Sequence, residues 1–380
     1  MKGFANAKVY IRGKGVVRAD IAVENGRIAR ISPPSQSVEP IAETGDCLLV
    51  AGFIDEHIHG AGGFDVMDGT QAALTAVSDT LVKEGTTSFL ATTMTCRADD
   101  IKKSLKAVAE FKRRRGARIL GVHLEGPFIS REYLGAQAEE HIQYPSNETF
   151  SDFLSASGSN IKIVTLAPEQ AGAERLIKYI EGLGITVSAG HSGASAEQIA
   201  DAMDCGLTCI THTFNAQSPL RHREIGTAGA ALLFDGLCCE LIADTVHVSV
   251  PAIKLLLKNK PKDKVVLITD AMRAKGLSDG VSELGGQTVY VKDGQARLKN
   301  GSLAGSVLKM NTAVKNLVEK CGCSVEYALD CATYNPAKNL GLEKEYGVIQ
   351  PGAAADFTLL DSAFNVVLTV VGGEVVYTVG

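Results

Sequence analysis

Histidine and carboxylate side chains stand at or just beyond the ends of apolar, strand-like runs in this sequence. Imidazole nitrogens and carboxylate oxygens are ligands that zinc, iron(II), manganese or cobalt accept. In the His57-x-His59 pair, residues two apart on a strand point to the same side, so both imidazoles can reach one ion. A single histidine of this kind is more often an ordinary core or surface residue. Several histidines and carboxylates that all lie at the ends of their strands indicate a catalytic metal site. The group comprises His57, His59, Glu125, His191, His212, His247 and Asp270.

Eight apolar runs carry these residues, and segments with helical periodicity separate the runs. This alternation indicates βα units and a parallel sheet. We therefore predict an α/β fold, a (β/α)8 barrel of the TIM type, in which catalytic side chains lie at the C-terminal ends of the strands. The runs cover residues 53–60, 87–94, 118–126, 161–169, 185–192, 208–215, 237–244 and 265–272, and helices are expected over 71–84, 99–115, 173–182 and 196–205.

Both ends of the chain are rich in strand patterns and differ from the middle. An Asn25-Gly26 turn separates apolar runs near the N-terminus, and Gly372-Gly373 does the same near the C-terminus. We expect residues 1–50 and 346–380 to form one small β-sandwich domain, and residues 51–345 to form the barrel. Residues 281–300 are expected to be an inserted hairpin.

Composition narrows the class of protein. The 380 residues are 45% hydrophobic and have a formal net charge of −5, with a single basic run at residues 112–115 that is expected to close a helix. This balance is typical of a globular protein and disfavours nucleic-acid binding. No run approaches the ~18 apolar residues of a membrane span, and the N-terminus lacks the apolar segment of a signal peptide. Nine cysteines without a CxxC pair are predicted to be free thiols, so we expect a cytoplasmic protein that binds no membrane.

Seven motifs carry a resemblance to a known family. In chain order they are DEHIHGAGGFDVMD, HLEGPFIS, SAGHS, THTFNAQSPL, HREIG, ITDAM and SLAGS. Together they resemble the N-acetylglucosamine-6-phosphate deacetylase family of the amidohydrolase superfamily. The resemblance spans nearly the whole chain, and HLEGP with THxxNA is specific to this branch, whereas HxH alone marks only the superfamily.

The resemblance implies a set of metal ligands. Glu125 takes the metal-bridging position that a carboxylated lysine fills in many relatives, and His191 and His212 hold the principal ion. His57 and His59 match a pair that holds a second ion with Asp270 in two-metal members. The expected cofactor is therefore one or two divalent ions per chain, zinc, iron(II), manganese or cobalt, and the presence of both histidines favours two.

The resemblance also implies how a sugar phosphate is bound and cleaved. Asp270 is expected to act as general base and then general acid in amide hydrolysis, although a plain metal ligand or a helix N-cap remains an alternative for it. The implied state is a homodimer, because a phosphate ligand in the family often comes from the neighbouring subunit. Arg223 and His247 match phosphate-side positions, Asn215 and Ala216 the sugar-phosphate end, and Leu303 and Gly305 the acetyl and sugar pocket.

Two positions depart from the family pattern. Gln137 stands where many members have histidine; it can still hydrogen-bond a hydroxyl group and is kept as a substrate-binding candidate, but it carries no charge. Ile225 replaces a proline in HREIG and frees the backbone that presents Arg223, for which a solvated loop residue is an equal alternative.

Two other functions stay open from the sequence. One is a different amidohydrolase, such as a D-aminoacylase-like or cyclic-amide hydrolase, but those usually need a strand-end lysine, and Glu125 occupies its place. The other is a catalytically inactive scaffold that acts through protein contacts. That hypothesis requires lost ligands, whereas all the expected ligands are present.

Overall fold

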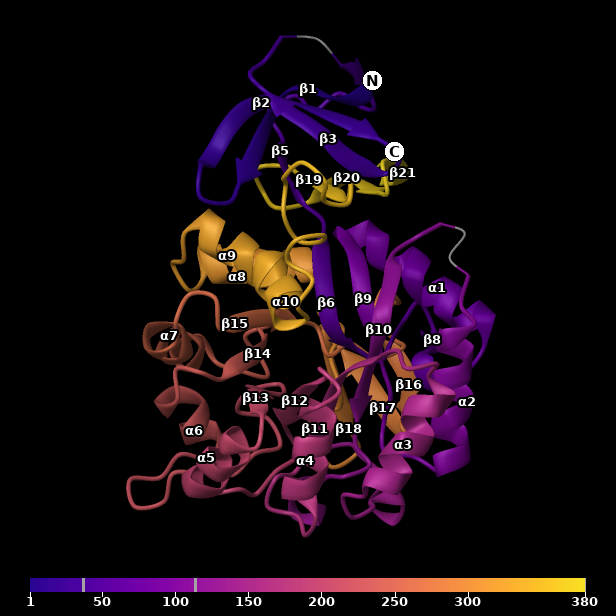
Figure 1. Ribbon diagram of the computed structural model, residues 1–380, viewed down its shortest axis with the longest axis vertical. Helices are drawn as coiled ribbons and strands as arrows, with labels where there is room; N and C mark the ends of the chain where they lie inside the picture. The colour runs from indigo at the N-terminus through magenta and orange to yellow at the C-terminus, as the bar shows by residue number, and fades with distance from the viewer. Residues whose placement is uncertain (36–37, 113–114, 380) are drawn as a thin grey trace.

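The computed structural model describes residues 1–35, 38–112 and 115–379. Within these ranges, parallel strands in the middle of the chain form one nearly closed barrel, which confirms the predicted fold class (Figure 1). Each of the eight predicted runs overlaps one of its strands, and two of the strands begin one residue before the run. In chain order they are β6 (Phe53–Ile58), β9 (Thr86–Thr92), β10 (Arg118–Glu125), β11 (Ile161–Leu166), β12 (Thr186–Ala189), β13 (Leu207–Ile210), β14 (Cys238–Ile242) and β15 (Val265–Ile268).

The barrel closes where its first and last strands meet. The order of hydrogen-bonded neighbours runs from β15 back through the other strands to β6. At the remaining seam, the Asp270 N–H donates to the His57 carbonyl oxygen at 2.9 Å, and the His59 N–H donates to the Ala271 carbonyl oxygen at 2.9 Å. The seam therefore brings His57, His59 and Asp270 side by side, although more than 200 residues separate the pair from Asp270 in the sequence.

Helices cover the outside of the barrel because their apolar residues recur at helical spacing. In α4, the buried residues Ala173, Leu176, Ile177 and Ile180 make one such stripe. The helix expected to reach residue 115 ends at Ala109 instead; of the basic run, Arg113 and Arg114 lie outside the described residues. The helices are α1 (Gln71–Leu81), α2 (Ala98–Ala109), α3 (Asn147–Ala156), α4 (Ala173–Glu181), α5 (Ala196–Asp204), α6 (Thr227–Leu233), α7 (Val250–Asn259), α8 (Met310–Glu319), α9 (Val325–Ala332) and α10 (Tyr334–Asn339).

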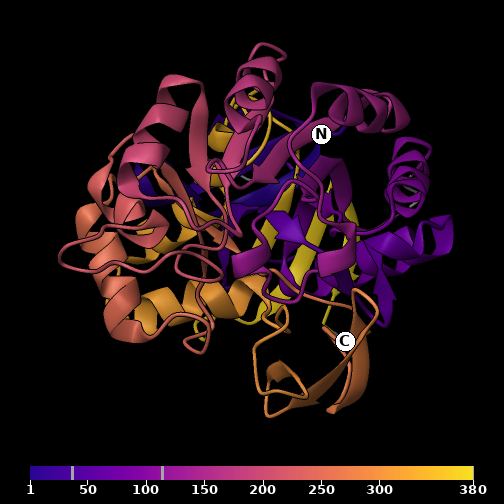
Figure 2. The same ribbon diagram turned by 90° about the horizontal axis from the view of Figure 1, so that it is seen from below.

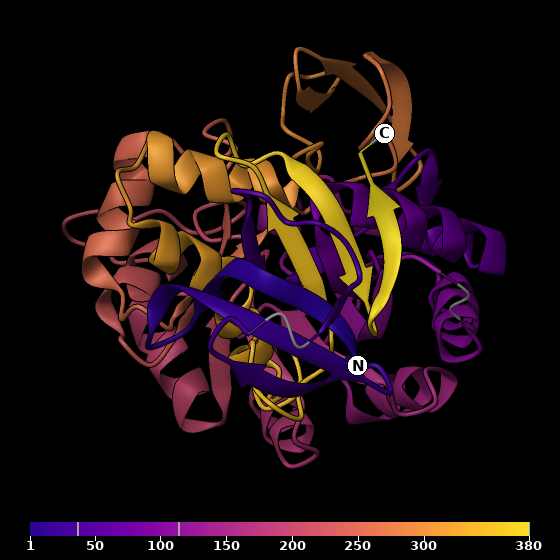
Figure 3. The same ribbon diagram turned by 90° about the horizontal axis from the view of Figure 1, so that it is seen from above.

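Strands from both termini share a second sheet at the N-terminal ends of the barrel strands (Figures 1 and 3). The sheet encloses its own apolar core, in which the rings of Phe4 and Phe357 pack edge to face with centroids 5.3 Å apart. This arrangement agrees with the expected β-sandwich, while the boundaries at 50 and 346 stay a prediction. Its strands are β1 (Lys2–Ile11), β2 (Gly15–Glu24), β3 (Arg27–Ser32), β4 (Glu39–Pro40), β5 (Leu48–Ala51), β19 (Phe357–Leu360), β20 (Val366–Val371) and β21 (Glu374–Thr378).

The predicted insertion after β15 is an antiparallel sheet rather than a single hairpin. It consists of β16 (Gly280–Leu284), β17 (Gln287–Lys292) and β18 (Gln295–Leu298) and stands to one side of the barrel (Figure 2). A short ribbon, β7 (Gly60–Ala61) and β8 (Phe64–Asp65), follows the first barrel strand. Among the described residues, no helix is long and apolar enough to cross a membrane.

Candidate metal centre and active site

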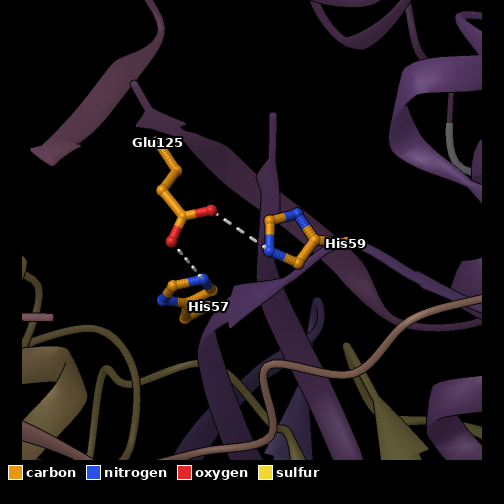
Figure 4. Close-up of side chains that lie close together, drawn as sticks. All are labelled: His57, His59 and Glu125. Carbon is orange, nitrogen blue, oxygen red and sulfur yellow. Dashed lines mark ion pairs between the residues drawn. The ribbon is translucent and has the colours of Figure 1, made fainter. Parts of the chain in front are cut away.

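The carboxylate of Glu125 lies at the centre of a ring of imidazoles. Its Oε1 is 3.2 Å from Nε2 of His191, 3.2 Å from Nε2 of His212 and 3.4 Å from Nε2 of His57. Its Oε2 is 3.3 Å from Nε2 of His59. Figure 4 shows the carboxylate reaching from β10 toward the two histidines of the first barrel strand, one oxygen facing each ring.

Asp270 completes the cluster from the last barrel strand. Its Oδ1 lies 3.3 Å from Nε2 of His59 and 3.6 Å from Nε2 of His57. All six side chains that the resemblance implies as metal ligands therefore lie together at the C-terminal ends of the strands.

The donor set fits a divalent metal ion. Nε2 of His191 and Nε2 of His212 face each other at 3.1 Å, close to the ~3.3 Å that separates two ligand atoms bound at 2.0–2.1 Å to one tetrahedral ion. Nε2 of His57 is fully buried without a hydrogen-bond partner. The facing nitrogens of His191 and His212 can share at most one proton between them without repulsion, whereas an ion bound between them would accept both lone pairs.

Unusual backbone conformations aim several of these side chains. His191, His212 and Asp270 all have positive φ angles, of 49°, 32° and 46°. A residue with a Cβ rarely adopts this conformation, and it persists at functional sites where the surrounding structure enforces it. Here it turns the chain sharply just after each strand, at the rim of the barrel.

The charges of the cluster stabilise one another. Burial opposes ionisation of Asp270, but the neighbouring His57, His59 and His212 lower its pKa to about 2. Burial likewise opposes protonation of His57, but the carboxylates of Glu240, Glu125 and Asp270 raise its pKa to about 9. Asp270 is therefore ionised at neutral pH, the state that a general base requires.

Glu240 is a part of the site that the sequence analysis missed. It lies in β14, is fully buried, and its Oε2 is 2.9 Å from Nδ1 of His57. The same oxygen accepts the backbone N–H of His212 at 3.1 Å. A carboxylate behind a ligand histidine sets its tautomer and its orientation. A lone glutamate in the apolar run LCCELIAD was the available signal.

Gln137 is held against the cluster at both ends of its side-chain amide. Its Oε1 accepts the backbone N–H of Thr95 at 2.7 Å, and its Nε2 donates to Oε2 of Glu125 at 2.7 Å. Both contacts are buried. Gln137, a substrate-binding candidate from the sequence, thus lines the cavity and also contacts the carboxylate of Glu125.

The cluster opens into a cavity of about 290 Å³. His247 lies on its wall, and its Nδ1 is 2.6 Å from Oδ2 of Asp244. Burial opposes the charge of Asp244, but the hydrogen bond from His247 lowers the pKa of that carboxyl group. The wall consists of His59, Met94, Glu125, Gly135, Ala136, Gln137, His191, His212, Asn215, Ala216, His247, Asp270, Leu284, Leu303 and Gly305.

Arg223 is the one substrate-binding candidate that the structure leaves outside this cavity. Its side chain is exposed in the loop between β13 and α6. Among the described residues, the cavity wall includes neither lysine nor arginine. A phosphate bound in one isolated chain would thus meet histidine and amide groups.

Comparison with known proteins identifies relatives of this chain. The Amidohydrolase family model matches residues 48–376. N-acetylglucosamine-6-phosphate deacetylase of Bacillus subtilis (strain 168) is 40% identical over 365 residues, which cover 94% of this chain and 92% of that protein. Solved structures of enzymes with the same name are similar throughout. That from Thermotoga maritima has a TM-score of 0.89 at 38% identity over 99% of both chains. That from Pasteurella multocida has a TM-score of 0.92 at 34% identity over 98% of this chain and 99% of its own. The chain described here belongs to the amidohydrolase family.

Proposed function

We propose that this protein hydrolyses the N-acetyl group of N-acetylglucosamine 6-phosphate and releases glucosamine 6-phosphate and acetate. The observation that carries the proposal is the placement of Asp270 beside the Glu125–histidine cluster, at the floor of a cavity large enough for a sugar. The relatives named above carry this activity in their names, and their match extends over nearly the full chain.

The residues of the cluster divide naturally between two ions. Glu125, His191 and His212 would hold the principal ion, and His57, His59 and Asp270 a second one, with zinc, iron(II), manganese or cobalt as suitable metals. A divalent ion bound there supplies a water with its pKa lowered from 15.7 toward ~7 and a Lewis acid for the acyl oxygen. Glu240 supports this arrangement because it orients the imidazole of His57.

Asp270 would carry the proton through the reaction. Its ionised carboxylate accepts a proton from the attacking water. As the carbon–nitrogen bond breaks, the same carboxyl group delivers that proton to the departing amino-sugar nitrogen. One residue thus serves first as base and then as acid, which requires that it face both the water and the nitrogen.

Substrate contacts are expected on the polar side of the cavity. His247, oriented by Asp244, offers Nε2 to the phosphate, while Asn215 and Ala216 hold the sugar-phosphate end, and Leu303 and Gly305 line the remaining wall. Arg223 would reach the phosphate from a second copy of the chain, because it is exposed and lies outside its own cavity. In a homodimer, the planar guanidinium group of Arg223 could bind two oxygens of the phosphate in the partner's cavity.

An assay for acetate release from N-acetylglucosamine 6-phosphate tests the proposal, with the unphosphorylated sugar as control. The reaction is run with zinc, iron(II), manganese or cobalt supplied. We expect release from the phosphorylated sugar at a far higher kcat/KM than from the control. Absence of release with every metal would reject the proposal and favour an inactive scaffold; cleavage of a cyclic amide instead would favour a ring hydrolase.

A further inference from the structure

The inserted sheet contributes an apolar wall to the cavity. Leu284, the last residue of β16, lines the cavity, and so does Met94, which follows β9. Both side chains are almost completely buried, with 2% and 3% of their surface exposed. They belong to one apolar cluster that joins the inserted sheet to the barrel, together with Met272, Ala274, Val289, Val291, Ala296 and Ala304.

The space around two glycines shows what lies next to these two side chains. A Cβ built on Gly305 would lie 3.4 Å from Cδ2 of Leu284 and 3.2 Å from the backbone oxygen of Asp270. A Cβ built on Gly285 would lie 3.1 Å from Cε of Met94. The methyl group of Met94 therefore lies near the turn of the inserted sheet, and a methyl group of Leu284 lies near Gly305 and the backbone of Asp270.

The turn of the inserted sheet is fastened to the wall of the site. Nε2 of Gln287 donates to the carbonyl oxygen of Ala136 at 2.9 Å. Ala136 precedes Gln137, whose amide contacts Glu125. The apolar wall is thus held in place by a hydrogen bond as well as by packing.

Polar and apolar parts of the cavity wall come from different strands. Met94 follows the second barrel strand, whereas Asn215 follows the sixth, which lies opposite it in an eight-stranded barrel. Met94 and Asn215 therefore line the cavity from opposite sides of the barrel, and the apolar contacts of Met94 and Leu284 are separate from the polar contacts that Asn215 offers.

We propose that Met94 and Leu284 receive the methyl end of the acyl group and determine which acyl length the enzyme accepts. This inference rests on the proposed deacetylase function. The acyl oxygen is directed to the Glu125–histidine cluster and the amide nitrogen to Asp270, so the acyl carbon chain is the part left to face the apolar wall. Since the wall is closely packed, each added methylene would displace side chains, and one methylene changes kcat/KM by about 10- to 200-fold in such pockets.

Variants that enlarge the pocket test this inference. The unaltered protein, Leu284→Ala and Met94→Ala are each assayed with three substrates. These are the N-acetyl, N-propionyl and N-butyryl derivatives of glucosamine 6-phosphate. We expect the propionyl-to-acetyl ratio of kcat/KM to rise about 10-fold or more in each variant, because the removed carbons make room for the added methylene. Val289→Ala is the matched control, since Val289 is buried in the same apolar cluster but does not line the cavity.

Each outcome has a distinct meaning. An unchanged ratio in both pocket variants, or an equal rise in Val289→Ala, overturns the role of Met94 and Leu284. If the unaltered protein releases no acetate from the acetyl substrate, the proposed function itself fails. Should Leu284→Ala not fold, Leu284→Val removes a single carbon, and its ratio must still rise for the inference to hold.

Discussion

Nε2 of Gln137 donates a hydrogen bond of 2.7 Å to Oε2 of Glu125, the oxygen that faces His59. The orientation of the amide is set from the other side, because Oε1 of Gln137 accepts the N–H of Thr95. A residue of the loop after the third barrel strand thereby holds the central carboxylate of the cluster. The contact is made by a neutral donor with a fixed direction.

Replacement of Gln137 by methionine should weaken metal binding while it preserves the side-chain length. A hydrogen bond to a charged group is worth about 1.5–3 kcal/mol, so we expect metal affinity to fall roughly 10-fold or more. Titration of the metal-free protein with zinc or cobalt measures this. Gln143→Met, in the same loop but outside the cavity wall, is the control. Equal affinities for Gln137→Met and the unaltered protein would show that the contact does not support the cluster.

Asp270→Asn should remove the proton carrier and leave the shape of the site intact. We expect the variant to fold, to retain metal and to lose at least ~10²-fold in kcat, the low end for loss of a general acid or base. Circular dichroism, metal analysis and the acetate-release assay check the three parts. Near-normal turnover would contradict the assigned role and leave Asp270 as a metal ligand only.

Glu240→Gln should act on the cluster through His57. The amide keeps the size of the side chain but loses the charge that holds Nδ1 of His57 at 2.9 Å. Loss of such a partner lowers metal affinity by about 10- to 100-fold in other metal sites. Competition with a chromophoric chelator measures the change, and an affinity within twofold of the unaltered protein would argue against this role.

Metal counting distinguishes one ion from two. The protein purified without added metal should contain about two ions per chain if His57 and His59 are working ligands, and His59→Asn should reduce the content to about one. Chelator treatment should abolish turnover, and readdition of metal should restore it. A content of one ion in the unaltered protein, unchanged in the variant, would remove the pair from the set of ligands.

The buried ion pair between Lys275 and Glu84 should contribute to the free energy of unfolding. Nζ of Lys275 lies 2.5 Å from Oε1 of Glu84, and both side chains are buried. Lys275→Met should lower the free energy of unfolding by about 3–5 kcal/mol, because it leaves the Glu84 carboxyl group buried without its partner. Urea denaturation measures the loss. The double variant with Glu84→Leu should recover part of it, and a single variant as stable as the parent would contradict the expectation.

Local sequence patterns were sufficient to predict much of the architecture. The first four residues of the run 265–272 are apolar because the strand Val265–Ile268 is buried throughout, so this strand could be predicted without knowledge of its neighbours. The HxH spacing placed His57 and His59 on one side of a strand for the same local reason. Helix ends were less well defined, as the end of α2 at Ala109 shows.

The sequence by itself predicted the alternation of strands and helices, the two β-rich ends and, through its resemblance to a known family, six of the residues that converge at the candidate metal centre. Only the tertiary structure decided which side chains touch: Glu240 against His57, Gln137 against Glu125, Leu284 in the cavity wall, and Arg223 outside it. The physical reason is that periodicity records which face of an element is buried, whereas contacts between residues far apart depend on strand register, barrel closure and the path of the loops.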